Sequence, residues 1–184
     1  MLQDEKNKVC AVIDPGFEPQ TILDRVAKLG LTVDAVLLTH GHFDHVGAVR
    51  DLVALTDCHV YLHPADTAMP PQMTAGPLYY THSLQGNETL SLCGMEIGVF
   101  HTPGHTPGCI CLYNEAEKRM LTGDTLFADG GFGRFDFKYG DKSILGHSLH
   151  RLFEMDGDIA IYPGHGRAST LRDEHRTLYY FEYR

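Results

Sequence analysis

The sequence predicts one α/β domain built in layers, and two residue patterns lead to that prediction. The first is a short apolar run followed by Thr, Pro or Gly and then by His or Asp, at residues 34–42, 95–105, 117–124 and 158–165. Such a run is typical of a β-strand that carries a polar side chain just after its C-terminal end. The second is an amphipathic helix pattern, with apolar residues near i, i+3 and i+4. This mixture favours a layered α/β domain over a helical bundle or a sandwich of strands alone.

The elements can be placed in chain order. The first strand is expected in "VCAVIDPG" (residues 9–16), where the Pro-Gly pair predicts a turn. Helices are expected at residues 19–31, 46–56 and 142–155. Cys109 and Cys111 in "CICLY" would face one side of a further strand and pack as small hydrophobic residues. Ligands of such sheets bind outside the carboxyl ends of strands, so the polar strand ends should meet in one place.

Length and composition limit the classes of protein. A chain of 184 residues suits a single domain, 1–184, with one sizeable core. The formal charge of −9 argues against a nucleic-acid surface. No apolar run approaches the ~18 residues that cross a bilayer, and the polar start "MLQDEKNKV" is unlike a signal peptide. The five cysteines are then expected as thiols in a reducing compartment, so we expect a cytoplasmic protein with neither a membrane nor a nucleic-acid partner.

The stretch "THGHFDH" (residues 39–45) places three imidazoles and a carboxylate directly after an apolar run. Each group alone has an ordinary explanation, because a lone His is usually solvated and Asp44 or Asp124 could cap a helix or close a turn. That explanation would have to hold separately at every polar strand end. Buried carboxylates and imidazoles are costly unless they are paired, hydrogen-bonded or metal-bound, and a divalent cation would partner all of them at once.

The sequence therefore predicts a site for two divalent metal ions. The candidate ligands form two sets of three and one bridging residue: His40, His42 and His105; Asp44, His45 and His165; and Asp124. Three protein ligands and a bridge leave each ion a position for water, which is typical of catalytic metal binding. Two ions ~3.5–4 Å apart can share a hydroxide and stabilise an oxyanion. The motif contains no thiolate, which disfavours a structural zinc site.

"THGHFDH" together with His105, Asp124 and His165 resembles the ligand signature of the metallo-β-lactamase superfamily, and the resemblance extends from Val9 to about Ser169. It implies an αββα sandwich with a dinuclear site in a cleft between two sheets. Within that superfamily, "HTPGHTPG", "LTGDTLF" and "GRFDFKYGD" are similar to the glyoxalase II group, particularly its short bacterial members. This similarity implies a small-molecule thioester substrate such as S-D-lactoylglutathione. The ions would be Zn²⁺, with Fe or Mn as alternatives.

Two other functions stay open at this point. Persulfide dioxygenases share the same ligand signature and resemble the chain in a "GRxDF"-like stretch, but they employ one Fe²⁺ held by the equivalents of His40, His105 and Asp124. A metal-binding relative without turnover is the other alternative. Against it, all seven ligand positions are filled, whereas inactive relatives usually lose at least one.

Further residues receive expected roles. Asp44 would be catalytic, orienting the attacking hydroxide besides binding an ion. Arg134 lies where glyoxalase II enzymes place a basic residue against glutathione, and a solvated arginine is the alternative. Phe132 and Phe135 would either line the pocket or pack. His101, although close to a ligand, is expected to have no metal role.

The chain departs from the glyoxalase II pattern in three places. The C-terminal helical domain of the long enzymes is absent, and Asp136 stands where those enzymes usually have an aromatic residue, so recognition of glutathione is left open. Only "MLQDEKNK" precedes the first expected strand. The first sheet would then be one strand short, or its edge would be covered by another subunit or by the tail "TLYYFEYR". Because an exposed edge strand favours association, a homo-oligomer is expected. The aromatic tail could form the contact or pack on its own domain: Tyr179, Tyr180, Phe181 and Tyr183.

Overall fold

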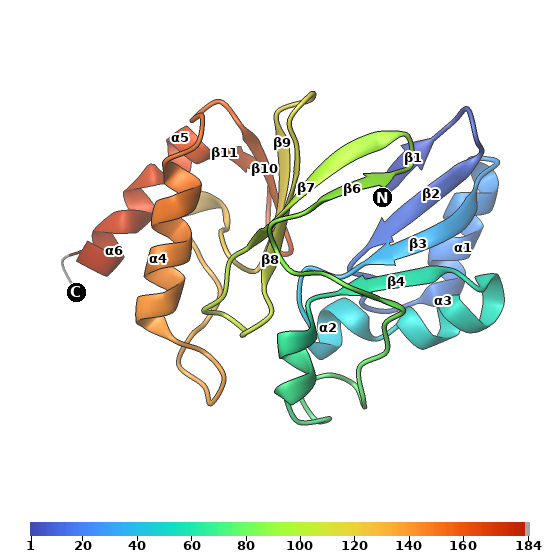
Figure 1. The fold of residues 1–184 in the computed structure, drawn as a ribbon, viewed down its shortest axis with the longest axis horizontal. Helices are drawn as coiled ribbons and strands as arrows, with labels where there is room; N and C mark the ends of the chain where they lie inside the picture. The colour runs from blue at the N-terminus through green and yellow to red at the C-terminus, as the bar shows by residue number, and fades with distance from the viewer. Residues whose placement is uncertain (183–184) are drawn as a thin grey trace.

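The computed structural model describes residues 1–182, with the side chains of residues 1–181. Two β-sheets pack face to face, and helices cover the outer face of each sheet (Figure 1). This is the αββα sandwich implied by the family resemblance, and the predicted fold class is confirmed. Within the described residues, no helix combines the length and the apolar character needed to cross a membrane.

The first sheet has five strands in the order β1-β2-β3-β4-β5. They are β1 Leu2–Asp4, β2 Val9–Ile13, β3 Thr32–Leu37, β4 His59–Leu62 and β5 His82–Ser83. Strands β2 to β5 run parallel, and β1 pairs with β2 antiparallel at the edge. Parallel neighbours need crossover connections, which here contain α1 (Pro19–Lys28) and then the pair α2 (Phe43–Val46) and α3 (Val49–Thr56).

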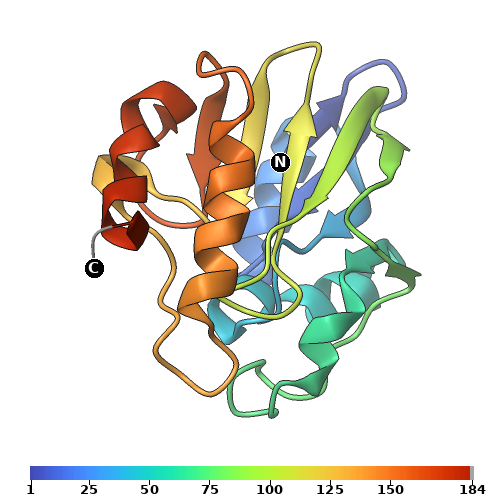
Figure 2. The ribbon, with the colours of Figure 1, turned by 60° about the vertical axis from the view of Figure 1, so that its left-hand side comes forward.

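The second sheet has six strands in the order β11-β10-β9-β8-β7-β6. They are β6 Thr89–Leu92, β7 Met95–His101, β8 Ile110–Asn114, β9 Arg119–Gly123, β10 Ala160–Pro163 and β11 Ser169–Thr170. Only β9 and β10 pair in parallel, and α4 (Lys142–Phe153) lies in the connection between them. Figure 2 shows α4 in front of this sheet, with α5 (Leu171–Glu174) and α6 (Leu178–Glu182) beside it.

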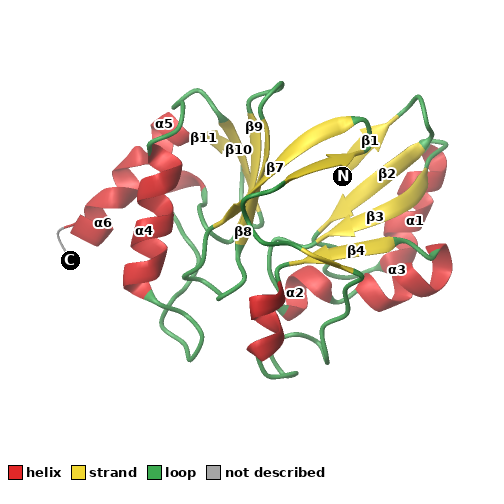
Figure 3. Cartoon of the chain, in the orientation of Figure 1, coloured by secondary structure: helices red, strands yellow, loops and turns green. Residues whose placement is uncertain are grey.

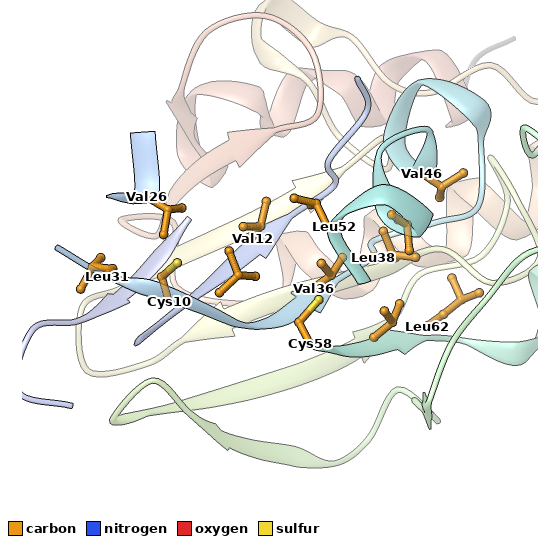
Figure 4. Packing of buried hydrophobic residues seen from close by; sticks show 13 residues of the cluster. Cys10, Val12, Val26, Leu31, Val36, Leu38, Val46, Leu52, Cys58 and Leu62 are labelled. Carbon is orange, nitrogen blue, oxygen red and sulfur yellow. The ribbon is translucent and has the colours of Figure 1, made fainter. Parts of the chain in front are cut away.

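Side chains along the strands point alternately to the two faces of a sheet, and both faces of each sheet are buried. In β2, Cys10 and Val12 point toward the helices, where they share a cluster with Val26 of α1 and Leu52 of α3 (Figure 4). Ala11 points the other way, into the cluster between the two sheets. A strand buried on both faces reads as a continuous apolar run, which is why "VCAVI" lacks polar alternation.

The second sheet is built in the same way. Cys111 of β8 packs with Leu149 of α4 on the helix side, while Ile110 and Leu112 face the first sheet. Cys109 is buried too, as expected, although it lies just before the strand. All five cysteines are buried free thiols in the part of the chain that the structure describes.

The sequence left open how the N-terminal edge of the first sheet is formed, and the structure shows it. Leu2–Asp4 form a short strand, β1, before the first expected one, so β1 rather than β2 is the edge of the sheet. The described part of the tail does not cover it: Tyr180 and Phe181 contact Phe132 and Phe135 on the far side of the second sheet. Tyr183 lies outside the described residues.

Candidate metal centre

All seven predicted ligands come together at the carboxyl ends of strands from both sheets. The residues that follow β3 are His40, His42, Asp44 and His45; His105 follows β7, Asp124 follows β9 and His165 follows β10. Loops carry most of these residues, drawn in green between the two sheets in Figure 3. The strand-end pattern therefore locates the site because each strand stops where its polar residue enters the cleft.

His40, His42 and His105 form the first donor set. Nε2 of His40 lies 3.1 Å from Nδ1 of His42, which lies 2.9 Å from Nε2 of His105. Two ligands bound at about 2.0–2.1 Å to a tetrahedral ion stand about 3.3 Å apart, so the three nitrogen atoms are close to the spacing of a metal site.

Hydrogen bonds behind two of the rings direct their lone pairs to this point. Nδ1 of His105 donates to the carbonyl oxygen of Arg134 at 2.7 Å. The hydroxyl of Thr39 donates to Asp14 at 2.6 Å, so its oxygen can accept from Nδ1 of His40 at 3.3 Å. Nε2 then carries the lone pair in both rings, an arrangement that histidine ligands of metals commonly show.

Burial keeps these three rings neutral. It lowers the pKa of His42 and of His105 to about 4, and it lowers the pKa of His40 well below its usual value, with neighbouring imidazoles adding to the effect. Neutral imidazole is the form that binds a metal, so this donor set needs no deprotonation at pH 7.

Asp44, His45 and His165 form the second donor set. Nε2 of His165 lies 3.3 Å from Nε2 of His45 and 3.3 Å from Oδ2 of Asp44. Behind His45, Nδ1 donates to Asp14 at 3.0 Å, which leaves Nε2 as the donor atom. Burial alone would lower the pKa of His45, but the hydrogen bond and the charge of Asp14 raise it above its usual value.

Asp124 lies between the two sets. Its Oδ1 is 3.4 Å from Nε2 of His45, and its Oδ2 is 3.5 Å from Nε2 of His105 and 3.6 Å from Nε2 of His165. Oδ1 is buried without a hydrogen-bond partner in the described part of the chain, and burial raises the pKa of this carboxyl to about 6. An unpartnered buried carboxylate oxygen is costly, and a cation at this position would partner it. The residues therefore fit divalent metal ions.

A cavity of about 520 Å³ opens onto the ligands, within the usual range for small-molecule sites. Aromatic and apolar side chains form much of its wall: Phe43, Met73, Phe127, Phe132 and Phe137. Arg134 also lines it, and its guanidinium donates to exposed Asp136 at 2.9 and 3.3 Å. The backbone carbonyl of Arg134, which orients His105, is a contribution that the sequence did not suggest.

The sequence analysis missed two acids behind the ligands, Asp66, which is fully buried, and Asp14, which is partly buried. Asp14 accepts hydrogen bonds from Thr39 and His45, and Asp66 accepts one from the backbone of Gly41, between two ligands. Asp14 ends the apolar run "VCAVI", so the strand-end pattern could have found it, whereas "HPADTA" gives no such signal around Asp66.

His101 contributes to packing in this region. It stacks on His63 with ring centroids 4.1 Å apart and donates to the carbonyl oxygen of Pro107 at 2.8 Å. It belongs to none of the groups of candidate metal ligands found among the described residues.

Known proteins resemble the chain in sequence and in fold. The hydroxyacylglutathione hydrolase GloC of Haemophilus influenzae is 36% identical over 187 residues, which cover 95% of this chain and 87% of that protein. The crystal structure of TTHA1623 in a di-iron-bound form has 37% identity and a TM-score of 0.81, covering 90% of this chain and 86% of that one. ETHE1 from Myxococcus xanthus has 29% identity and a TM-score of 0.82, covering 96% of this chain and 75% of that one.

The family signature spans nearly the whole sandwich. A profile of the metallo-β-lactamase superfamily matches residues 2–165, from β1 to the last predicted ligand, His165. The match, the fold and the clustered strand-end residues lead to the same assignment. The chain belongs to the metallo-β-lactamase superfamily.

Proposed function

We propose that the protein is a hydrolase that uses two divalent metal ions to cleave an acyl thioester, with S-D-lactoylglutathione as the first substrate to test. One observation carries the proposal: Asp124 lies within 3.6 Å of nitrogen atoms from both donor sets, where one carboxylate could serve two ions. The similarity to a hydroxyacylglutathione hydrolase supports the thioester as substrate.

Seven residues of the chain would hold the two ions. The first ion would be held by His40, His42 and His105, the second by Asp44, His45 and His165, and both by Asp124. Bound there, the ions would lower the pKa of water toward about 7 and supply positive charge near the oxyanion. We propose zinc for this role, with iron or manganese as alternatives, because sites of nitrogen and oxygen donors accept all three.

Asp44 is the proposed catalytic residue of the chain. It both faces Nε2 of His165 at 3.3 Å and lines the cavity, so its carboxylate can accept a hydrogen bond from the attacking water and orient it. The departing thiolate has an intrinsic pKa of about 8.5, so it needs little help from a general acid. Phe127 and Phe137 on the cavity wall would exclude other water molecules.

Arg134 is the proposed contact for the thiol half of the substrate. Arg134 lines the cavity, and its guanidinium is held by Asp136 in an exposed ion pair. Such pairs are worth about 0–1 kcal/mol, so a carboxylate of the substrate can compete for the guanidinium. The buried thiols suit a reducing compartment, and we propose that the activity is cytoplasmic.

The function is tested with two substrates and one metal analysis. Purified protein is incubated with S-D-lactoylglutathione and, separately, with glutathione persulfide under oxygen, while thiol release and oxygen uptake are recorded. Thiol release with about two metal ions per chain supports the proposal. Oxygen uptake with a single iron per chain would identify a dioxygenase instead. If neither reaction is detected although the metal content is intact, the protein is a metal-binding relative without turnover.

The bridging role of Asp124 is tested by mutation. Asp124→Ala should lower metal content and abolish hydrolysis together, because it removes a ligand of both ions. Asp24→Ala, which removes an exposed carboxylate on α1, is the matched control and should change neither. Full metal content and full rate in Asp124→Ala would refute the assignment.

A further inference from the structure

Asp66 is a fully buried carboxylate that the proposed reaction does not use. It lies in the short 3₁₀ helix Pro64–Ala68 that follows β4, and its exposed fraction is 0%. Its Oδ2 accepts from the backbone N–H of Gly41 at 2.7 Å and from the hydroxyl of Thr106 at 3.0 Å, while its Oδ1 accepts from the N–H of Gly108 at 2.6 Å. A buried carboxylate that accepts three hydrogen bonds at these distances has the partners that offset the cost of its burial.

These three hydrogen bonds join the two segments that carry the first donor set. Gly41 stands between His40 and His42, and Thr106 directly follows His105. The two segments are 63 residues apart, from His42 to His105, and they come from different sheets. One carboxylate thus connects the backbone of both arms at a point next to their ligands.

The two glycines show how closely the backbones approach this acid. A Cβ atom on Gly108 would lie 2.7 Å from Cγ of Asp66, and one on Gly41 would lie 3.2 Å from its Cβ. Neither approach leaves ordinary room for a side chain. Contact with Asp66 therefore explains Gly108, whereas a Cβ atom on Gly41 would first meet the side chains of Leu78 at 2.7 Å and Met69 at 3.0 Å.

The charge of Asp66 acts in the same direction as its geometry. Its three hydrogen-bond donors are all neutral, so they orient the carboxylate without cancelling its charge. A cation held by His40, His42 and His105 would be attracted by that charge, since three imidazoles bring none of their own. Asp14, which is partly buried, stands behind His45 of the second set in a similar way and also supports His40 through Thr39.

We propose that Asp66 is a positioning residue for the first metal ion: it holds the His40–His42 segment and the His105 segment at the spacing that one ion requires. The proposal rests on the proposed metal-dependent function, but it concerns the binding of one ion rather than the reaction. Its specific consequence is selectivity, because loss of Asp66 should weaken the first ion far more than the second.

The test is a Co²⁺ titration of metal-free protein, followed by absorption spectroscopy and by competition with a chelator. His42→Ala and His165→Ala supply reference spectra for the second and the first site alone. Asp66→Asn keeps the size of the side chain but loses its charge and turns one acceptor into a donor. The dissociation constant of the first ion should rise about 10–100-fold, as for other residues that orient metal ligands, and at least tenfold more than that of the second.

Two further variants keep the result interpretable. Thr106→Val removes one of the three hydrogen bonds while leaving Asp66 in place, and should weaken the first ion in the same direction but less. Val26→Ala makes a cavity in the core cluster beside α1 and controls for a general loss of stability. Tight binding of both ions in Asp66→Asn and Thr106→Val would overturn the proposal. It would also be overturned if Asp66→Asn weakened the binding of both ions equally and by the same factor as Val26→Ala. Because ion binding is read directly, failure of thioester hydrolysis leaves the outcome valid.

Discussion

Gly164, directly before His165, offers a sharp test of the site geometry. Its backbone N–H donates to the carbonyl oxygen of Gly123, which fixes it beside the ligands. A Cβ atom added at this position would lie 2.4 Å from Oδ1 of Asp124 and 2.7 Å from Cε1 of His45. Gly164→Ala therefore brings a methyl group against two proposed ligands, including the oxygen that lacks a partner.

The displacement needed is large on the scale of metal coordination. Cβ atoms essentially never approach other atoms closer than 3.0 Å, so Oδ1 of Asp124 must move by at least about 0.6 Å. Ligand distances in metal sites hold to within about 0.2 Å. A misplacement approaching 1 Å can lower a rate by about 10²-fold, or about 2.7 kcal/mol of transition-state stabilisation. We expect weaker metal binding and a loss in kcat/KM that approaches this size.

Gly166, on the other side of His165, provides the matched control. Its φ is +87° and nothing lies within 4 Å of the position of an added Cβ. Gly166→Ala should lower stability by about 1–2 kcal/mol through backbone strain, while metal content and hydrolysis persist. Metal content, thermal unfolding and thiol release are measured on both variants. Two tightly bound ions and an unchanged rate in Gly164→Ala would refute the site geometry described here.

Three other predictions follow from the same structure. Chelation should abolish hydrolysis and lower the free energy of unfolding, by about 2.7 kcal/mol for each ion that had been at 100 times its dissociation constant, and a thermal shift that returns on adding Zn²⁺ would verify it. Burial and neighbouring His101 lower the pKa of His63 to about 4, so the folded state binds fewer protons than the unfolded state between about pH 6.5 and 4. Stability should fall by about 1–3 kcal/mol as the pH drops through that window, and urea unfolding at pH 7 and 5 should show a smaller fall in His63→Gln. Leu149→Ala should cost about 2–5 kcal/mol, because this fully buried side chain of α4 leaves a cavity, yet the ion-binding constants should stay unchanged.

Much of the fold could be predicted because strands of four or more residues and helices of ten or more can show a recognisable pattern of apolar residues. Strands β2, β3, β7, β9 and β10 and helices α1 and α4 lie where the sequence placed them. Strands β1 and β5 have three and two residues, too few to show any alternation, and they exist only through pairing with a neighbour. The helix expected at 46–56 starts only at Val49, and α2 precedes it. Gly47, between α2 and α3, lies so close to the carbonyl oxygen of Gly16 that a Cβ would come within 2.2 Å of it.

The sequence predicted those residues of the candidate site that a pattern within one short segment can reveal. His and Asp directly after apolar runs are candidate ligands because a strand end is the place where a polar side chain can enter the cleft. Asp66 could not be recognised in this way. Its partners are the backbone N–H groups of Gly41 and Gly108, which lie in two remote segments. Every residue except proline has such a group, so the sequence does not single these two out.

Charge balance favours two ions over one. Four carboxylates lie among the ligands or directly behind them: Asp14, Asp44, Asp66 and Asp124. The three imidazoles of the first set are neutral, and His45, whose pKa Asp14 raises, would have to be neutral to bind an ion, so these acids would face no cationic side chain in the metal-bound site. Two divalent ions would match four negative charges, whereas one would leave about half of them uncompensated in surroundings of low polarity, where an unpaired charge is expensive. A chain loaded with a single iron, as the dioxygenase alternative requires, should therefore bind a second divalent ion tightly; a site that refuses it would contradict both the charge argument and the dinuclear hydrolase.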